Sequence, residues 1–122
     1  MGRFTQTLLL SAALWAPGAA IAASPQISEA LTMPKPGVIC DRYICANGQD
    51  GVSVALTMHY LGKKAAARLT SFGEFNREAF TFANGVHCDI QARQCRKDRY
   101  YGADGQPSGE IDHDATRQLF VY

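Results

Sequence analysis

The sequence lacks an excess of either charge, and it lacks an apolar run long enough to cross a membrane. Its 12 Lys and Arg residues against 11 Asp and Glu residues leave a formal net charge of +1. Proteins that hold nucleic acid through phosphate contacts carry a clear basic excess, so nucleic acid is not an expected partner. The apolar run Leu8–Ala16 is less than half of the about 20 residues that a spanning helix needs.

Several catalytic and cofactor motifs are also absent. The sequence has no Gly-x-Ser-x-Gly elbow, no glycine-rich phosphate loop and no His-Glu-x-x-His zinc motif. Its cysteines never occur as Cys-x-x-Cys, the spacing of thiol–disulfide oxidoreductases. We therefore expect no cofactor, and no residue is predicted to be catalytic on the basis of a motif.

What is present suits one small globular domain. A chain of 122 residues is long enough for a single domain and no more. Hydrophobic residues make up 47% of the chain, which argues against a disordered protein.

Residues 1–22 have the three parts of a secretory signal peptide. An arginine supplies the positive charge, Leu8–Ala16 the apolar stretch, and Ala20 and Ala22 the small residues before a cleavage site. A membrane anchor is the alternative, but the run is short and Pro17 would interrupt it. We expect cleavage after Ala22 and a location in the periplasm or outside the cell.

The four cysteines predict a disulfide framework, because an even number is typical of small exported domains. Of the three possible connectivities, the local one pairs Cys40 with Cys45 and Cys88 with Cys95. The first cysteine of each pair lies in the same context, Gly-Val-x-Cys-Asp, and the residues between paired cysteines have the length of hairpin loops. We therefore favour local pairing, although the count alone also allows crossed pairings.

A zinc site is the competing interpretation of these cysteines. Zinc knuckles and ribbons usually separate paired cysteines by two to four residues. The spacings here are Cys-x4-Cys and Cys-x6-Cys, and an oxidising compartment favours disulfides. We expect no bound metal.

Turn residues and apolar alternation divide the rest of the chain. Residues 23–36 contain three prolines and predict an extended leader rather than a packed element, so that a single domain occupies 37–122. Within it the pattern predicts, in order, strands at 38–40, 52–56, 80–82, 86–88 and 95–101, with a tight turn at 83–85 and a flexible loop over 101–110.

One main helix is predicted between the two cysteine pairs. Apolar residues recur at helical spacing over 58–72, with Thr57 as the N-cap and Gly73 at the end. Gly62 either allows close packing or marks a later helix start. A short helix capped by Asp114 follows near the C-terminus. The expected fold is α+β: a small antiparallel sheet of two disulfide-braced hairpins packed on one main helix.

Two short sequence motifs also occur twice in the chain. Gly-Val-x-Cys-Asp occurs at 37–41 and again at 85–89, and Thr57-x-x-Tyr-Leu is echoed by Thr116-x-x-Leu-Phe after the second cysteine pair. Internal duplication of a hairpin-plus-helix unit is one hypothesis, and chance similarity between two hairpins is the other.

Together these motifs resemble one known family. In order, the string is Cys40-x4-Cys45, Leu56-Thr-x-x-Tyr-Leu-Gly62, Phe80-Thr-Phe-x-Asn-Gly-Val-x-Cys-Asp89-x5-Cys95 and Thr116-x-x-Leu-Phe120. It resembles the YcgJ-like family, also called Fels prophage protein-like, of small exported bacterial proteins, over residues 37–121. The resemblance implies an exported, bacterial or prophage-borne domain of unassigned activity, and it implies no catalytic residues.

Histidines and carboxylates are the candidates for chemistry. The segment Asp112-His113-Asp114 can bind a metal or orient a base in principle, but a solvated loop leading into a helix is the simpler interpretation. His87 alternates with its neighbours on a hairpin and is expected to face solvent. Glu74 and Glu78 are spaced as surface charges rather than as the carboxyl pair of a glycosidase.

The most local charge feature is a basic run followed by two tyrosines. We take it as the candidate binding surface, made of Arg93, Arg96, Lys97, Arg99, Tyr100 and Tyr101. Such a surface can contact an envelope glycan or an acidic protein. Asp89 and Asp98 lie in the same stretch, so a solvated hairpin face is the alternative.

Two functions from different classes follow. The first is a non-enzymatic exported binding or interaction domain of the cell envelope, whose partner is an envelope protein or a glycan. The second is a small envelope hydrolase, or an inhibitor of a lysozyme-type hydrolase, motivated by size, disulfides and compartment. A deep pocket with a carboxylate pair would favour the enzyme, and an exposed loop on a rigid scaffold favours binding.

Overall fold

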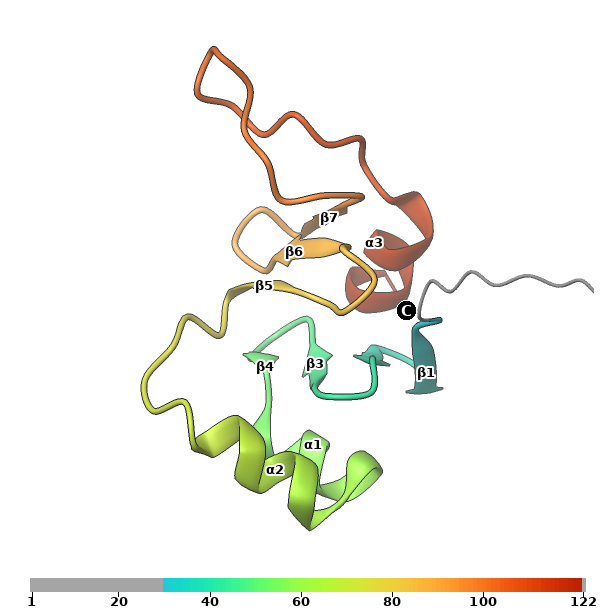
Figure 1. The fold of residues 1–122 in the computed structure, drawn as a ribbon. Coiled ribbons are helices and arrows are strands. Elements are labelled where there is room, and N and C mark those ends of the chain that lie inside the picture. The colour runs from blue at the N-terminus through green and yellow to red at the C-terminus, as the bar shows by residue number, and fades with distance from the viewer. Residues whose placement is uncertain (1–29, 122) are drawn as a thin grey trace, which may run out of the picture.

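Two small antiparallel sheets and three helices make up the part of the chain that the computed structural model describes, residues 30–121 (Figure 1). Sheet A contains, in spatial order, β1 Thr32–Lys35, β2 Val38–Cys40, β3 Cys45–Asn47 and β4 Gly51–Val52. Sheet B contains β5 Ala79–Thr81, β6 His87–Asp89 and β7 Gln94–Arg96. The helices are α1 Val54–Leu61, α2 Lys63–Thr70 and α3 His113–Phe120. The predicted signal peptide lies outside the described residues.

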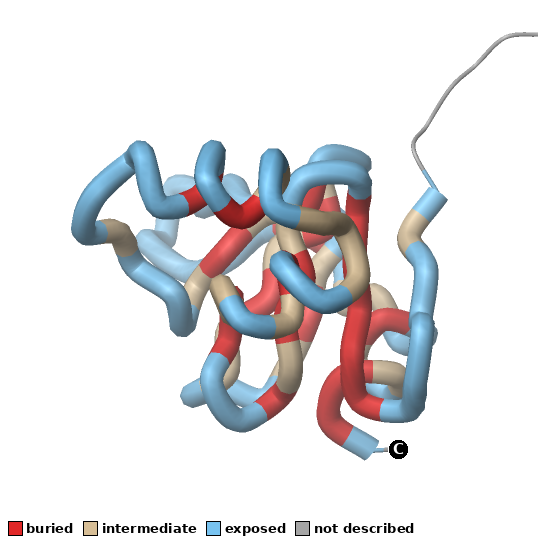
Figure 2. Tube along the Cα trace, turned by 90° about the horizontal axis from the view of Figure 1, so that it is seen from below, coloured by how far each residue is buried: buried red, intermediate tan, exposed pale blue. Residues whose placement is uncertain are grey.

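Sheet A lies between α1 and α2 on one face and sheet B on the other (Figure 1). Successive strand residues point to opposite faces, so Val38 and Cys40 pack with Tyr60 while Ile39 enters the core shared with sheet B. That core also takes Phe82 and, from α3, Leu119. Figure 2 shows the buried residues gathered in the interior of the molecule, with exposed segments around them.

The α+β class and the two disulfide-braced hairpins are confirmed. Cys40 lies opposite Cys45 and Cys88 lies opposite Cys95 in antiparallel register, and each pair forms a disulfide. The tight turn after β5 is also confirmed, with Gly85 at a φ of 96° that favours glycine. The two hairpins lie in two sheets rather than one, because the first belongs to the four-stranded sheet A and the second to the three-stranded sheet B.

The predicted main helix is divided in two at Gly62. Its φ of 99° is incompatible with a continuing helix, so Gly62 ends α1 and precedes α2. The predicted N-caps are wrong as well: Ser53 caps α1 instead of Thr57, and Asp112 caps α3 instead of Asp114. The predicted strand at 52–56 accordingly ends at β4.

Part of the predicted leader is a strand. Thr32–Lys35 forms β1, an extended segment of exposed residues that pairs with β2, so this part of the predicted leader belongs to sheet A. Proline and polar residues suit an edge strand whose outer side faces solvent.

The structure contains the same unit twice. Each unit has three antiparallel strands, a disulfide between the second and third strands, and a capped helix. In the first unit the Thr57 hydroxyl accepts a hydrogen bond from Cys45 N (3.0 Å) and donates one to Ser53 O (2.7 Å). In the second unit Thr116 accepts from Cys95 N (2.9 Å) and donates to Asp112 O (2.8 Å).

The hydrogen bonds around this junction match in both units. The amide of each helix cap donates to the carbonyl of the second cysteine, from Ser53 N and from Asp112 N, at 2.9 Å in both cases. The aspartate after each first cysteine accepts two amide hydrogen bonds within its hairpin loop, as Asp41 and Asp89 do. The repeated sequence motifs therefore mark a repeated structure.

One buried carboxylate joins the two units. Asp41 is 6% exposed, and its Oδ2 accepts a hydrogen bond of 2.6 Å from Ala83 N in the turn of the second unit. A second link runs from Val52 N to Arg77 O (2.9 Å), beside the edge of sheet B.

Replacing Thr57 with valine is expected to destabilise the fold by about 1–3 kcal/mol, because the isosteric change leaves the buried Cys45 amide without its acceptor. Equilibrium urea unfolding of the oxidised protein measures the change. Thr70→Val is the matched control, since the Thr70 hydroxyl lies on the exposed side of α2 and bonds only to Ala67 O. Equal losses in the two variants would contradict the role assigned to Thr57.

Candidate functional site

The outer face of sheet B is where the two units differ in chemistry. In the first unit Ile39 lies opposite Ala46, and both are fully buried between the two sheets. At the equivalent places of the second unit His87 lies opposite Arg96. Both side chains are only partly buried. The same position in the repeat is therefore apolar where a layer covers it and polar where it borders solvent.

The connection from third strand to helix is also much longer in the second unit. Val52 pairs with Ala46 in the first unit, and Ile111 forms the equivalent bridge with Arg96 in the second. Residues 47–51 fill this connection in the first unit, whereas residues 97–110, which we call the arm, fill it in the second. The arm projects from the sheet B end of the molecule (Figure 1).

The arm is a hairpin, which differs from the flexible loop expected over 101–110. Its backbone pairs Lys97 N with Glu110 O (2.7 Å), Ser108 N with Tyr100 O (2.9 Å), and Gly102 N with Gln106 O (2.8 Å). The Asp-Gly pair at 104–105 is the turn signature that could have indicated this hairpin.

The arm and the outer face of sheet B enclose a hollow of about 240 Å³. The strands contribute polar side chains to its lining, His87, Asp89, Gln94 and Arg96. The arm contributes Asp98, Arg99, Tyr100, Tyr101, Gln106 and Pro107, and Ala92 comes from the loop between β6 and β7. A second hollow of about 280 Å³ lies beside Thr81 and Gly85 and shares Asp98, Arg99 and Tyr100 with the first.

The structure brings four of the six predicted surface residues to this hollow: Arg96, Arg99, Tyr100 and Tyr101. Arg93 is elsewhere, because its Nη2 donates to Phe120 O (2.7 Å) and its guanidinium lies 5.1 Å from the Phe120 ring centre. Lys97 also lies outside the lining, with its Nζ 4.0 Å from Glu110 Oε1.

Sequence reasoning missed the contribution of sheet B to the hollow. His87 was expected to face solvent, but it is partly buried under the arm, and Asp89 and Gln94 were not expected at a site. The pairing of Cys88 with Cys95 was the usable indication, because it places His87 opposite Arg96 on the face away from the core.

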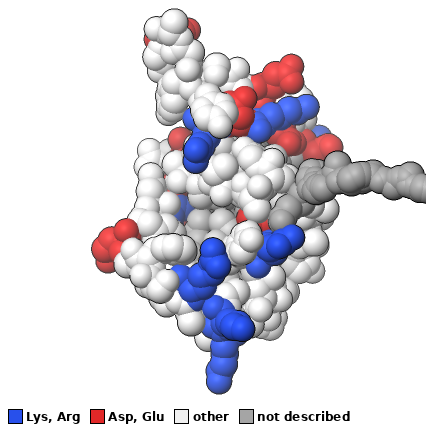
Figure 3. Space-filling view, in the orientation of Figure 1, with Lys and Arg blue, Asp and Glu red and all other residues white. Residues whose placement is uncertain are grey.

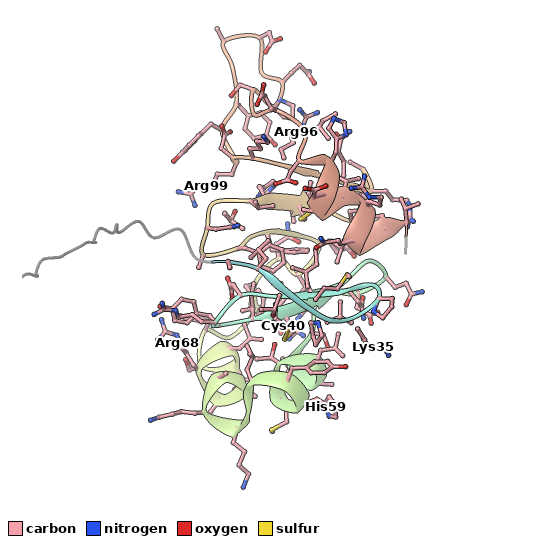
Figure 4. The ribbon with its side chains drawn as sticks, turned by 90° about the vertical axis from the view of Figure 1, so that its right-hand side faces the viewer. Lys35, Cys40, His59, Arg68, Arg96 and Arg99 are labelled. Atoms are coloured by element: carbon pink, nitrogen blue, oxygen red, sulfur yellow. A yellow bond between two sulfur atoms is a disulfide. The ribbon has the colours of Figure 1, made fainter. Side chains whose placement is uncertain are left out.

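The two arginines of the hollow differ in the number of groups that their guanidinium groups contact. Arg96 is held by Gly109 O (2.7 Å) and Gln94 Oε1 (3.0 Å). Arg99 lies 5.8 Å from the Tyr100 ring centre, and within residues 30–121 no carboxylate lies at ion-pair distance from it. Figure 4 shows Arg96 and Arg99 at the arm end of the molecule, opposite His59 and Arg68 at the helical end.

The carboxylates of the hollow hold local turns. Asp89 Oδ1 accepts from Gln91 N (2.9 Å) and Ala92 N (3.2 Å), and Asp98 Oδ1 accepts from Tyr100 N (3.0 Å). Figure 3 shows both charge signs side by side at the arm end, whereas Lys and Arg atoms dominate the helical end of the same face.

His87 has a pKa below its ordinary value of 6.5, because partial burial disfavours the charged ring. The Asp89 carboxylate opposes this shift, and the Arg99 guanidinium adds to it. The Nδ1 atom lies 2.9 Å from the Thr81 hydroxyl, which orients the ring in the hollow. His87 is therefore neutral at pH 7.

The other candidate groups have structural roles. Asp112 Oδ1 accepts from Ala115 N as the cap of α3, and Asp114 pairs with Arg117 at 2.7 Å. Glu78 accepts a hydrogen bond from Gln91 Nε2. Between residues 30 and 121 no three His, Cys, Asp or Glu side chains are grouped as a metal site requires.

None of the helices formed by the described residues combines the length and apolarity that crossing a membrane requires.

These features define a class: a small disulfide-braced α+β protein, built from two repeated units, with a polar hollow on its outer sheet. A family model described as YcgJ protein matches residues 31–120. An uncharacterized protein YcgJ of Escherichia coli (strain K12) is 48% identical over 99 residues, which cover 81% of this chain and 80% of that protein. The chain belongs to the YcgJ family, as the sequence motifs indicated. No solved structure shows a significant match.

His87 is expected to make stability depend on pH below 6.5. The pKa of His87 is lower in the folded than in the unfolded chain, so the unfolded chain binds the proton more readily. The contribution of His87 to the free energy of unfolding is therefore complete above the unfolded pKa and is lost as the pH falls through the folded pKa. Urea unfolding at about pH 7.5 and about pH 5.5 should show this loss in the wild type and a smaller loss in His87→Gln. The exposed His113 provides the control: His113→Gln should keep the wild-type loss, and an unchanged loss in His87→Gln would contradict the assignment.

Proposed function

We propose that this protein is an exported binding module of the bacterial cell envelope, which acts without catalysis and recognises its partner at the hollow of sheet B. The observation that carries the proposal is the arm. This connection is much longer than the equivalent one in the first unit, and it covers the outer face of sheet B, a face that is polar only in the second unit.

Export is supported by the cysteines. All four cysteines of the chain form buried disulfides, and such bonds persist in oxidising compartments and are rare in the reducing cytosol. The predicted signal peptide at 1–22 points in the same direction.

Binding is favoured over hydrolysis by what the carboxylates do. Asp89 and Asp98 each use one carboxylate oxygen to hold a turn. The hollow is also smaller than the about 300–1,000 Å³ typical of sites for whole small-molecule ligands. Its size suits one segment of a larger partner, and the exposed tyrosines beside it can contact the neighbouring segments.

The floor of the hollow is rigid, which favours recognition. The disulfide between Cys88 and Cys95 closes the hairpin beneath it, and Thr116 ties that hairpin to α3. A preorganised surface loses less conformational freedom on binding than a mobile one.

Export makes a direct prediction. Protein recovered from the periplasmic fraction of the expressing bacterium should have an intact mass that corresponds to a chain beginning at Ala23 with two disulfides. Changing Ala20 and Ala22 together to leucine should block cleavage and retain residues 1–22. A full-length, reduced chain recovered only from the cytosol would contradict export.

The binding surface is tested with a double variant, Arg99→Ala/Tyr101→Ala, of the oxidised protein. The yield of site-specific cross-linking in envelope fractions should fall about tenfold in this variant, because two exposed side chains of the arm are removed. Arg68→Ala/Phe72→Ala is the matched control: it removes an exposed arginine and an exposed aromatic ring at the helical end. Equal yields from wild type, variant and control would contradict the proposed surface, as would turnover of a cell-wall substrate that depends on Asp89 and Asp98.

A further inference from the structure

The polar groups of the hollow balance in charge. Asp89 and Asp98 offset Arg96 and Arg99, and His87 is neutral at pH 7. A site built for an anion or a cation would have an excess of the opposite charge. This lining favours an uncharged ligand with many polar groups.

The hydrogen-bond groups that remain free include both donors and acceptors. Asp89 and Asp98 each have a second carboxylate oxygen without a partner among the described residues. The Arg99 guanidinium offers several donors, and Gln94 keeps its amide NH₂ because only its Oε1 is used. A hydroxyl group donates and accepts at once, so a polyhydroxylated ligand satisfies both kinds of group. A phosphate or carboxylate would face the unpaired aspartate oxygens, and an ammonium group would face Arg99.

Two aromatic rings lie beside these groups. Tyr100 and Tyr101 are 62% and 68% exposed, so both rings are accessible to a ligand. A tyrosine presents a flat apolar face and a polar tip, so it suits a ligand with an apolar face and a polar rim. A sugar ring has this form, with C–H groups on its face and hydroxyls around its edge.

The two hollows are arranged as neighbours. They share Asp98, Arg99 and Tyr100, so these side chains form the wall between them. The first encloses about 240 Å³ and the second about 280 Å³, and each has room for one sugar ring rather than for a longer segment. Adjacent units of a chain can therefore occupy the two sides of the wall.

We propose that the hollow binds an uncharged glycan, with one sugar ring against Tyr100 and Tyr101 and the next ring across the wall formed by Arg99. This proposal rests on the proposed function and specifies the chemical class of its partner. Asp89, Asp98, Gln94 and Arg99 hydrogen-bond the hydroxyls, while the disulfide-braced strands hold these groups in place.

The test is an NMR titration of the oxidised, ¹⁵N-labelled protein, purified from the periplasm in its exported form, with defined sugars. The probes are maltotriose and tri-N-acetylglucosamine, their monosaccharides, and two anions, trigalacturonate and inorganic phosphate. At least one uncharged trisaccharide should shift the amide signals of residues 97–110 and of β6. It should bind about tenfold more tightly than its monosaccharide, because two adjacent rings are engaged.

Three variants separate the sugar contacts from the fold. Tyr101→Ala should weaken trisaccharide binding about tenfold, whereas Tyr101→Phe should keep it within about twofold because the ring remains. Phe72→Ala removes a similarly exposed ring at the helical end and should leave trisaccharide binding unchanged. Unperturbed spectra of each free variant outside the substituted site confirm the fold.

Several results would overturn the glycan proposal. These are the absence of arm shifts with either uncharged trisaccharide, binding of trigalacturonate or phosphate alone, or equal weakening by Tyr101→Ala and Phe72→Ala. If sugars fail while envelope cross-linking still depends on Arg99 and Tyr101, the glycan is wrong and the binding surface stands. If cross-linking is equal in all variants, the proposed function itself fails.

Discussion

A threonine hydroxyl behind each disulfide is the contact on which the rest of this structure depends. The strands have only two to four residues, and strands this short are not stable as isolated hairpins. The disulfide closes each hairpin, and the hydroxyl of Thr57 or Thr116 binds the backbone of its second cysteine while it also bonds within its own helix. One side chain thus fixes the third strand and the helix relative to each other in both units. The shared core between the two sheets is built on this arrangement.

The two units have the same fold, but they lie in different surroundings. Sheet A has a layer on both faces, so Ile39 and Ala46 must be apolar. Sheet B has its outer face open, so the equivalent His87 and Arg96 can be polar, and the long connection over residues 97–110 folds across them. The proposed binding role therefore depends on two differences between the repeated units, the open outer face of sheet B and the longer connection over residues 97–110. A rigid repeated scaffold with one varied connection separates stability from recognition, which is the usual division between a fold and its loops.

The helix starts show why local patterns mislead in this chain. Thr57 and Asp114 are good capping residues, but the backbone of a capping residue must itself have an extended, non-helical conformation. At Ser53 and at Asp112 that conformation is set by an amide bonded to a cysteine carbonyl, a contact from another part of the chain. Thr57 is instead buried inside the first turns of α1, where its hydroxyl serves the strand. The direction of Arg93, away from the other basic residues, depends in the same way on α3 packing nearby.

The sequence by itself determined the features that depend on neighbours in the chain. These are the turn that needs glycine at position 85, the repeat of Gly-Val-x-Cys-Asp and the family, and they favour the pairing of nearby cysteines over crossed pairings. Only the tertiary structure decided which face of each hairpin is covered, because burial depends on what the other unit presents. It also decided that the arm folds over sheet B and brings Arg96 and Arg99 to one hollow. Alternation along a strand assigns residues to two faces, but it does not say which face borders solvent.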